Sequence, residues 1–494
     1  MKITIEKLDE VHVRVLSDAS IEQELSDFFT FQYPGAQFTP QFRAKLWDGK
    51  VRMYDIIRKT LYVGLVHYIY DFASTRGYEV EEVTPLHVTN GITHQQIEDY
   101  AKWLNPYGRG EPIEIRDYQV EAVTQALDRE RVLLLSPTAS GKSFIIYTAM
   151  RWHLEHGRKC IIIVPTTSLV EQLYADFEDY SSANGWKTSY HCQKLYSGFT
   201  KDISKDVLIT TWQSVYKQPK QWFSQFDVIF GDEAHQFKAN SLTLVMGKLT
   251  NCKYRIGTTG TLDNKKVHKL VLEGIFGPMH RVTTTKELMD TGRLTALNIT
   301  CLLMKYDDIT RQGRKNNQYQ DEMDFIVTWE KRNIFIRNLG LKCTGNTLVL
   351  FQYVEKHGKI LLYIIKEKAH EDRKVFFVYG GTDTEQREAI RHITEKENDA
   401  IIIASYGTFS TGINIPSLEN IIFASPTKSK IRNLQSIGRG LRLNNGKTIC
   451  NLYDIADDLQ WKKSVNHTLK HAAERYKIYA EEQFNVKLLG VNLE

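Results

Sequence analysis

The hydrophobic positions downstream of residue 112 fall into short continuous runs that alternate with longer amphipathic stretches. Each run has the length of a buried strand and is rich in aliphatic and β-branched residues. A strand that is apolar along its length has both faces covered, as in a parallel sheet flanked by helices. The runs form two groups, which predicts an α/β fold with two parallel-sheet lobes. The first group is VLLL (132–135), CIIIV (160–164), DVLIT (206–210) and DVIF (227–230); the second is TLVLF (347–351), VFFVY (375–379), AIIIA (400–404), NIIFA (420–424) and TICNLY (448–453).

The chain upstream of these runs predicts a separate small α/β domain. Its strand-like strings ITI and VHVRV alternate apolar and polar residues, and IEQELSDFF and YDFASTRG have helical character. The segment Asn105–Pro112 (NPYGRGEP) holds two prolines and two glycines, which is typical of a linker. Near the other end, Trp461, Val465 and Leu469 recur at helical spacing. The expected domains are an amino-terminal α/β domain (1–104), a linker (105–112), lobe 1 (113–285), lobe 2 (286–455) and carboxy-terminal helices (456–494).

Length and composition are those of a globular chain. The 494 residues suffice for about three domains. Hydrophobic residues at 42% and charged residues at 25% exclude a wholly disordered or collagen-like protein. No apolar run approaches the length of a membrane span, so no membrane association is expected. The six cysteines are at least 32 residues apart (192 − 160), without a CxxC pair, which predicts a reduced cytoplasmic protein without structural zinc.

The net charge of +5 (64 − 59) is unevenly distributed. Residues 1–100 carry 10 Lys and Arg against 15 Asp and Glu, so the remainder carries +10 (54 − 44). This excess is compatible with a polyanionic partner. Charge alone nevertheless favours an ordinary solvated surface. The basic residues of the carboxy-terminal stretch fit both interpretations equally well.

The string SPTASGKS (Ser136–Ser143) follows a predicted strand and precedes a predicted helix. This is the setting of a phosphate-binding loop, in which backbone N–H groups and a helix N-terminus surround phosphate oxygens. Lys142 would reach the β- and γ-phosphates, and Ser143 would bind magnesium. The first glycine of the GxxxxGK[ST] pattern is replaced by Ser136, so a purely structural turn is the alternative. The predicted nucleotide-binding residues of this loop are Ser140, Gly141, Lys142 and Ser143.

The string VIFGDEAH places two adjacent carboxylates at the end of an apolar strand, 90 residues after Lys142 (232 − 142). Asp232 would hold magnesium through its water shell, and Glu233 would orient and deprotonate the attacking water. The alternative is a helix start with two exposed acids. Paired carboxylates at a buried strand end are costly unless a cation or catalysis requires them. After a phosphate-binding loop, the catalytic interpretation is therefore favoured, with Lys142, Asp232 and Glu233 as catalytic residues.

The chain from Arg116 to Arg442 resembles superfamily 2 helicases and translocases, with their motifs in family order. The resemblance implies two RecA-like lobes, with ATP and Mg²⁺ as cofactors. IRDYQVEAV resembles the motif that reads adenine, here through Arg116 and Gln119. VPTTSLVEQ (164–172) and ITTWQS (209–214) resemble motifs that grip nucleic-acid phosphates, which implies contacts from Thr166 and Thr211. GTTGTL (257–262) resembles the element that couples hydrolysis to strand movement, although Gly260 replaces the usual alanine.

In the second lobe, TLVLFQYVEKHGK, YGGTDTEQRE (379–388), TFSTGINIP (408–416) and QSIGRGLR (435–442) continue the resemblance. Arg439 and Arg442 are three residues apart, on one face of a predicted helix. From lobe 2 they would act as arginine fingers on the γ-phosphate, a role worth about 10³–10⁵ in rate. A solvated helix face is the alternative. Gly412 would contact the nucleotide ribose, whereas Asp454 fits either a weak functional role or a helix cap.

The string FTPQFRAKLWDGKVRMYD, near the amino terminus, resembles the first domain of UvsW-type phage helicases, so the likeness extends over nearly the whole chain. It implies ATP-driven remodelling of branched DNA, including Holliday junctions, stalled forks, D-loops and R-loops. Residues 43–59 carry six basic against two acidic side chains. Trp47 and Tyr54 lie among them, as base stacking or wedging at a junction would require. The alternative is a β-hairpin that turns at Asp48-Gly49, with Trp47 in its core. The predicted nucleic-acid contacts here are Arg43, Lys45, Trp47, Lys50 and Arg52.

Other functions compete with a branched-DNA helicase. A duplex translocase that does not separate strands and an RNA helicase share the same motor motifs. A metabolic P-loop kinase is disfavoured by the arginines of QSIGRGLR, and a passive ATP-gated binding module is disfavoured by Glu233. Branched or duplex DNA is the expected partner, with an RNA–DNA hybrid and replication or recombination proteins as further candidates. Polarity, step size and oligomeric state do not follow from the sequence.

Overall fold

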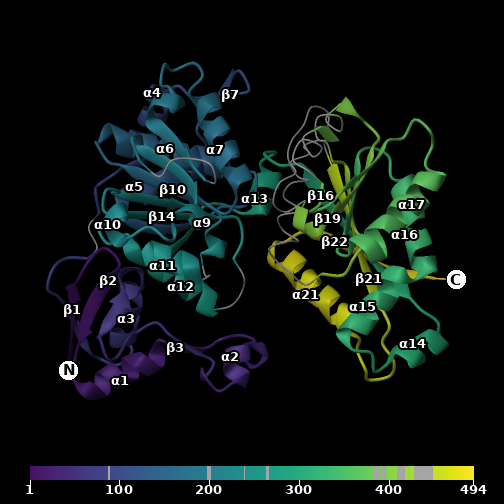
Figure 1. Ribbon diagram of the computed structural model, residues 1–494, viewed down its shortest axis with the longest axis horizontal. Helices are drawn as coiled ribbons and strands as arrows, with labels where there is room; N and C mark the ends of the chain where they lie inside the picture. The colour runs from purple at the N-terminus through teal and green to yellow at the C-terminus, as the bar shows by residue number, and fades with distance from the viewer. Residues whose placement is uncertain are drawn as a thin grey trace. The chain divides into compact units, whose positions relative to one another are not determined.

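The computed structural model describes most of the chain as helices, strands and loops (Figure 1). The described residues are 1–86, 89–196, 202–237, 240–262, 266–382, 389–390, 393, 396–408, 418–427 and 449–493. They divide into two compact units: the first comprises residues 1–136 and 141–283, and the second comprises residues 137–140 and those after 283. The first unit holds the amino-terminal domain and lobe 1, and the second holds lobe 2. No described helix is long and apolar enough to cross a bilayer.

The amino-terminal domain is a four-stranded sheet with helices packed against it. Ile3, Ile5, Val13 and Val15 alternate with polar residues and are buried, which explains why these strings form strands with one apolar face. The strand order is β5-β2-β1-β6, in which β1 and β6 are parallel and the other pairs antiparallel. Its elements are β1 (Lys2–Lys7), β2 (His12–Leu16), α1 (Ala19–Phe28), β5 (Thr60–Tyr62), η2 (Val63–Leu65), α3 (Val66–Ser74) and β6 (Glu79–Glu82).

An arm leaves this domain between α1 and β5. It contains β3 (Thr30–Gln32), η1 (Ala36–Phe38), α2 (Pro40–Arg43) and β4 (Lys50–Arg52). The antiparallel ribbon β3–β4 pairs Phe31 with Val51, so residues 33–49 form its far end. The alternative of a β-hairpin that turns at Asp48-Gly49 is therefore wrong, because these two residues enter β4 instead of joining two strands.

Lobe 1 has a seven-stranded parallel sheet in the order β11-β12-β10-β13-β14-β9-β15. Its strands are β9 (Arg131–Leu135), β10 (Cys160–Val164), β11 (Cys192–Leu195), β12 (Val207–Thr211), β13 (Val228–Gly231), β14 (Tyr254–Thr259) and β15 (Met279–Arg281). Alternate residues of β10 belong to different cores: Ile162 packs on one face of the sheet and Ile161 on the other. Burial on both faces explains the uninterrupted apolar run.

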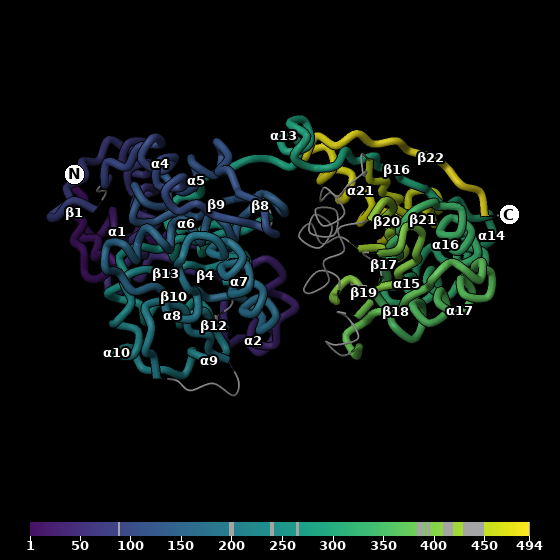
Figure 2. The backbone as a smooth tube through the Cα atoms, turned by 90° about the horizontal axis from the view of Figure 1, so that it is seen from above, coloured from purple at the N-terminus to yellow at the C-terminus, as the bar shows by residue number. Residues whose placement is uncertain are grey.

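Helices cover both faces of this sheet (Figures 1 and 2). One core includes α4 (His94–Leu104), α5 (Asp117–Asp128), α6 (Lys142–Glu155) and α7 (Thr167–Tyr180), and the other α9 (Trp212–Val215), α10 (Lys220–Phe223), α11 (Asn240–Lys248) and α12 (Lys266–Phe276). Residues 94–104, expected to close the amino-terminal domain, thus pack in lobe 1, through Ile97 and Leu104. The expected linker forms the small hairpin β7 (Tyr107–Gly108) and β8 (Glu111–Pro112).

Lobe 2 repeats this architecture with the strand order β18-β19-β17-β20-β21-β16-β22, all in parallel pairs. Its strands are β16 (Ala296–Lys305), β17 (Thr347–Phe351), β18 (Val375–Val378), β19 (Ile401–Ser405), β20 (Asn420–Phe423), β21 (Ile449–Asp458) and β22 (Asn485–Asn492). Helices α15 (Tyr319–Thr328), α16 (Glu330–Lys342) and α17 (Lys359–Lys368) pack against the sheet. The prediction of two parallel-sheet lobes is confirmed.

The carboxy-terminal region differs from the expected helices. The stretch 456–494 holds the end of β21, the helix α21 (His467–Glu481) and the strand β22, which joins the sheet beside β16 (Figure 2). Trp461 lies in a tight turn, paired with Ser464, so the spacing of Trp461, Val465 and Leu469 does not describe one helix. Strand β22 is exposed at most positions, which leaves no alternating burial in its sequence.

Candidate nucleotide and nucleic-acid sites

The phosphate-binding loop joins the end of β9 to the start of α6, as its sequence predicts. Gly141 is the residue before the helix and has φ +84°, a conformation that side chains disfavour. A Cβ atom at this position would lie 2.4 Å from Nε2 of Gln119. Glycine is therefore required both by the backbone and by the close approach of Gln119. A helix N-terminus at this point is the element that favours an anion in a phosphate-binding loop.

Gln119 and Arg116 begin helix α5 beside this loop. The Gln119 side chain is 4% exposed and its Oε1 accepts a hydrogen bond of 3.1 Å from the Arg116 backbone N–H. Arg116 in turn donates from Nη1 to the Tyr118 hydroxyl at 2.7 Å. The predicted adenine-reading residues and the predicted phosphate loop are thus brought together in space.

The carboxylate of Asp232 lies at the end of β13, near the amine of Lys142. Lys142 Nζ donates to the Ser136 carbonyl at 3.3 Å. Burial and the adjacent Glu233 carboxylate raise the pKa of Asp232, while the positive charge of Lys142 acts in the opposite direction. Two carboxylates and one amine thus share a site in which a divalent cation would relieve the repulsion between the acids.

The DEAH string is connected to GTTGTL by two hydrogen bonds. Thr258 donates to Asp232 Oδ1 at 2.8 Å, and the His235 ring nitrogen Nδ1 lies 3.0 Å from the Thr259 hydroxyl. The Ser136 backbone N–H donates to the Thr259 carbonyl at 2.8 Å, which extends the connection to the phosphate loop. His235 Nδ1 also lies 3.3 Å from Glu233, whose φ of +50° is unusual for a side-chain-bearing residue. These contacts link three sequence motifs directly.

Tyr180 is a residue of this site that the sequence does not reveal. The hydroxyl groups of Tyr180 and Ser143 are hydrogen bonded at 2.8 Å, from the end of α7 to the start of α6. Burial raises the pKa of Tyr180, so its phenol stays protonated at neutral pH. The 37 residues between the two positions hide this contact from any local pattern.

Thr166 follows strand β10 and Thr211 ends the adjacent strand β12, at the same edge of the sheet. Thr166 caps α7 by accepting a hydrogen bond of 3.3 Å from the Leu169 backbone N–H. Thr211 is 4% exposed, and its hydroxyl lies 2.9 Å from that of Ser214. Thr166 is thus the more accessible of the two proposed phosphate contacts.

The predicted amino-terminal contacts lie at the far end of the arm. Arg43, Lys45 and Lys50 are exposed, and Arg52 forms an ion pair with Asp48. This contact, reinforced by the Lys50 backbone N–H, lowers the pKa of Asp48 to about 2. The Trp47 indole donates to the Lys50 carbonyl at 2.8 Å and packs edge-on against a tyrosine of the arm.

Tyr54, the second aromatic residue of this segment, has a different role from the one expected. It is 1% exposed and its hydroxyl donates to the Val15 carbonyl at 3.2 Å. Tyr54 is therefore a core residue of the amino-terminal sheet and is not available to stack on bases. At the far end of the arm the exposed apolar side chains are instead Phe38, 70% exposed, and Leu46, 81% exposed.

Three predicted residues, Gly412, Arg439 and Arg442, lie outside the described residues. Asp454, for which a helix cap was an alternative, is fully buried and ion paired with Arg475. The helix-cap interpretation is wrong, because Asp454 lies inside strand β21.

A divalent cation and a nucleotide fit the chemistry of the first-lobe site. Among the described residues, no group of three or more His, Cys, Asp or Glu side chains forms a metal site by itself. One or two protein oxygens combined with nucleotide phosphates and water are the usual ligands of Mg²⁺. Ser143 and Asp232 could supply such oxygens, and α6 begins directly after Gly141.

Comparisons with known proteins agree with this geometry. Family models match residues 2–82 (DNA helicase UvsW, N-terminal), 112–264 (Type III restriction enzyme, res subunit) and 330–444 (helicase conserved C-terminal domain). The ATP-dependent DNA helicase uvsW of Enterobacteria phage T4 is 35% identical, with 100% of both chains covered. The DNA 3'-5' translocase XPB2 of Sulfurisphaera tokodaii is 23% identical, over 67% of this chain and 79% of that protein.

Solved structures are similar to this chain as well. The crystal structure of T4 UvsW aligns over 100% of both chains with a TM-score of 0.54 and 34% identity. The DNA-bound restriction-modification enzyme LlaBIII aligns over 85% of this chain and 34% of its own, with a TM-score of 0.57 and 15% identity, which is a likeness of fold alone. With a full-length relative at 35% identity, this chain belongs to the UvsW family of ATP-dependent DNA helicases.

Proposed function

We propose that this helicase remodels branched DNA, such as Holliday junctions, stalled forks, D-loops and R-loops, in recombination, repair and replication. The observation that carries the proposal is the end of the arm, residues 36–50, which we call the basic tip. There the exposed Leu46 lines a surface hollow together with the cationic side chains of Arg43 and Lys45, and Phe38 is exposed in the same segment. Apolar side chains that enter between base pairs, next to cations that bind phosphate, are how proteins open or kink a duplex.

The basic tip suits a junction because its domain is fixed to the motor. The amino-terminal sheet and lobe 1 belong to one compact unit, and residues of α12 pack in the core of the amino-terminal domain. Arg131 of β9 donates to the Glu10 carbonyl at 2.8 Å and forms an ion pair with the Glu10 carboxylate. A tip that moves with lobe 1 can hold or divide DNA arms while the motor advances.

The motor chemistry is assigned to residues of lobe 1. The Gly141 turn and the N-terminus of α6 bind the phosphates, and Lys142 neutralises their charge. Bound Mg²⁺ would supply Lewis-acid stabilisation of the phosphoryl group, and Ser143 and Asp232 would hold it, with Ser143 released from Tyr180. Glu233 orients the attacking water and accepts its proton. Arg439 and Arg442 are proposed to stabilise the transition state from lobe 2.

The experiment that tests this function measures ATP hydrolysis and strand separation with different nucleic acids. The wild-type protein is titrated with single-stranded, duplex, forked and four-way DNA, and with RNA of matched sequence. Highest hydrolysis and unwinding with forked and four-way DNA would support the proposal. Equal hydrolysis on plain duplex without strand separation would show a duplex translocase, and preference for RNA would show an RNA helicase.

A further inference from the structure

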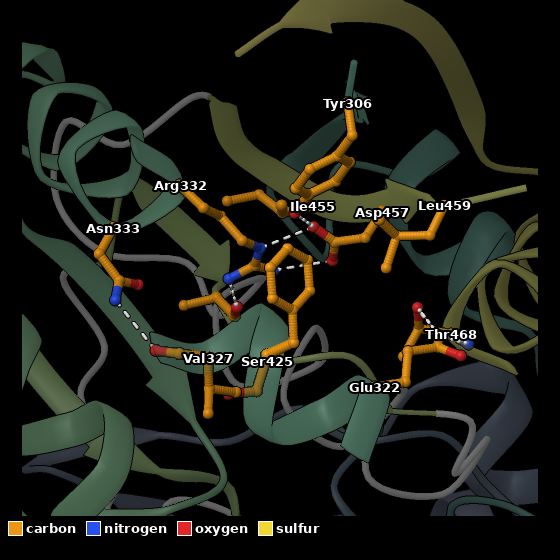
Figure 3. Close-up of polar contacts among 12 residues, drawn as sticks. Tyr306, Glu322, Val327, Arg332, Asn333, Ser425, Ile455, Asp457, Leu459 and Thr468 are labelled. Atoms are coloured by element: carbon orange, nitrogen blue, oxygen red, sulfur yellow. Dashed lines mark hydrogen bonds and ion pairs between the residues drawn. The ribbon is translucent and has the colours of Figure 1, made fainter. Parts of the chain in front are cut away.

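Lobe 2 contains two ion pairs that are completely removed from water, and both carboxylates come from strand β21. Arg332 of α16 donates to Asp457 from Nε at 2.7 Å and from Nη2 at 3.0 Å (Figure 3). Arg475 of α21 donates to Asp454 from Nη2 at 2.8 Å. All four side chains are at most 1% exposed. Buried pairs of this kind add little net stability, although the loss of either partner destabilises the fold strongly. Stability alone therefore does not account for these two pairs.

Each guanidinium has a further nitrogen that binds the chain just after β20. Arg332 Nη1 donates to the Ala424 carbonyl at 2.9 Å, and Arg475 Nη1 donates to the Thr427 carbonyl at 2.8 Å. The two arginines, which come from helices 143 positions apart (475 − 332), thus hold the same four-residue stretch. A planar guanidinium can bind a carboxylate and a carbonyl at once, which a lysine amine cannot do with the same geometry.

Ser425, one of the two residues between Ala424 and Thr427, is fixed as well. The Ser425 hydroxyl lies 2.8 Å from Nδ1 of His357, and the Ser425 carbonyl accepts a hydrogen bond of 3.1 Å from the Tyr406 hydroxyl. His357 is fully buried, and burial followed by the charge of Arg332 lowers its pKa well below the ordinary value. The imidazole is therefore neutral at physiological pH. Residues 424–427 are thus held by four side chains that are far apart in the sequence: Arg332, His357, Tyr406 and Arg475.

This stretch borders the segment that carries the proposed arginine fingers. Thr427 immediately precedes residues 428–448, which include Arg439 and Arg442, and strand β21 begins at Ile449. Arg475 therefore connects the residue before this segment to Asp454 in the strand after it. Arg332 makes the same kind of connection, between Ala424 and Asp457. The chain before residues 428–448 and the strand after them are therefore joined through the same two buried cations.

We propose that Arg332 and Arg475 are positioning residues for ATP hydrolysis: they join the chain before residues 428–448, which include Arg439 and Arg442, to the strand after them. This inference rests on the proposed role of those two residues as arginine fingers. Arg332 and Arg475 touch neither nucleotide nor substrate, and they act through the backbone at Ala424 and Thr427. An error of about 1 Å in the position of a catalytic group can cost about 100-fold in rate.

The decisive variant is Arg475→Lys, which retains a cation for Asp454 and removes the fork that also reaches Thr427. We expect kcat for DNA-stimulated ATP hydrolysis to fall by about 10–100-fold, with KM for ATP changed by less than about threefold. The same substitution in an Arg439→Ala background should lower kcat by less than about twofold, since coupled residues are not additive. Arg332→Lys is expected to behave in the same way.

Arg373→Lys is a matched control in the same lobe. Arg373 also pairs with a carboxylate, Asp399, and donates to the carbonyls of Leu341 and Cys343, but it does not contact residues 424–427. Its kcat and KM should stay at wild-type values. If circular dichroism shows that Arg475→Lys is unfolded, Tyr479→Phe takes its place, alone and combined with Arg439→Ala. Tyr479→Phe removes only the 2.9 Å hydrogen bond to Asp454.

The outcomes separate the two proposals. A folded Arg475→Lys or Tyr479→Phe protein with wild-type kcat, or with a loss that persists in full in the Arg439→Ala background, would overturn the positioning role. A loss of the same size in Arg373→Lys would overturn it too, since a general weakening of lobe 2 would then explain the result. Wild-type kcat for Arg439→Ala alone would instead reject the arginine finger itself.

Discussion

The Tyr68 hydroxyl donates a hydrogen bond of 2.7 Å to the Glu273 carboxylate and so joins the amino-terminal domain to helix α12 of lobe 1. The Glu273 side chain is 3% exposed, and its other oxygen accepts a hydrogen bond of 3.2 Å from the Met279 backbone N–H. Because the Glu273 carboxylate is shielded from water, the loss of the Tyr68 hydrogen bond would not be replaced by a hydrogen bond to solvent. Helix α12 begins four residues after the end of GTTGTL (266 − 262), so the same element borders the hydrolysis site and supports the arm.

The first prediction concerns the close approach of these domains at Gly64. A Cβ atom at Gly64 would lie 2.0 Å from the Glu273 carbonyl oxygen, which belongs to the helix backbone and cannot turn away. We expect Gly64→Ala to lower the free energy of unfolding by about 1–3 kcal/mol, the range for an overpacked core. Urea denaturation measures this loss. Gly247→Ala is the control, because a Cβ at Gly247 meets no atom within 4 Å; equal stability of the two variants would contradict the rigid docking of the domain.

The second prediction concerns catalysis. Lys142→Ala and Glu233→Gln should each lower kcat for ATP hydrolysis by at least about 100-fold, because the first removes a preorganised charge from the phosphates and the second removes a positioned base. Glu233→Gln should still bind ATP with magnesium, because Asp232 and Ser143 are unchanged. Steady-state hydrolysis and equilibrium binding of a fluorescent ATP analogue measure the two effects separately.

Glu178→Gln is a suitable control for the catalytic variants, since Glu178 is an exposed residue of α7 in the same lobe. Its hydrolysis rate should match that of the wild-type protein. Near-wild-type turnover by a folded Glu233→Gln protein would reject Glu233 as the base. Loss of ATP binding in that variant would show that Glu233 contributes to magnesium coordination as well.

The sequence predicts the parts of this molecule whose structure is encoded locally. The run CIIIV predicts a doubly covered strand because Ile161 and Ile162 must both be buried, on opposite faces. The SPTASGKS string likewise predicts its own turn, since Gly141 supplies the positive φ that begins α6. Patterns of this kind need no knowledge of distant residues.

Contacts between distant residues are what the sequence hides. Helix α21 begins at His467 because Glu322, 145 residues away, accepts hydrogen bonds from the His467 and Thr468 backbone N–H groups (Figure 3). The spacing of Trp461, Val465 and Leu469 predicts a helix that begins too early in the sequence. Asp454 could not be identified as a buried ion-pair partner without the position of Arg475. Propensity and periodicity carry no information about such pairs.

The third prediction concerns pH. Burial lowers the pKa of His357 well below 6.5, whereas the unfolded chain titrates near that value. As pH falls below about 6.5, His357 becomes protonated in the unfolded state but stays neutral in the folded state, so the free energy of unfolding falls. The expected slope is about 1.4 kcal/mol per pH unit between the unfolded and folded pKa values.

His357→Gln removes this titration and keeps a polar side chain for Ser425. Urea unfolding between pH 5 and 7 should show a pH dependence shallower than wild type by about 1.4 kcal/mol per unit. The control is His370→Gln, because the His370 side chain is 80% exposed and should leave the slope unchanged. Parallel curves for wild type and His357→Gln would contradict a neutral, buried imidazole at this position.

The last prediction separates the charges of the basic tip from its apolar side chains. Arg43→Ala with Lys45→Ala should weaken binding to forks of any sequence and reduce the slope of log K against log salt by about two units, or about one per lost phosphate contact. Leu46→Ala should leave that slope unchanged, because it removes no charge. Its expected effect is slower strand separation at forks and four-way junctions, since a wedge acts on base stacking.

Leu46 is a better position than Trp47 for testing the wedge. Trp47 also supports the arm through its hydrogen bond to the Lys50 carbonyl, so Trp47→Ala can act by unfolding the tip. Leu46 is 81% exposed, and its truncation leaves the fold intact. ATP hydrolysis on saturating single-stranded DNA should be unchanged in all these variants, because Lys142 and Glu233 lie in lobe 1. Arg14→Ala, an exposed cation of strand β2 outside the tip, serves as the charge control. Unwinding of forks at the wild-type rate by folded Leu46→Ala protein, at low protein concentration and moderate salt, would reject the wedge and leave the tip as a charged surface alone.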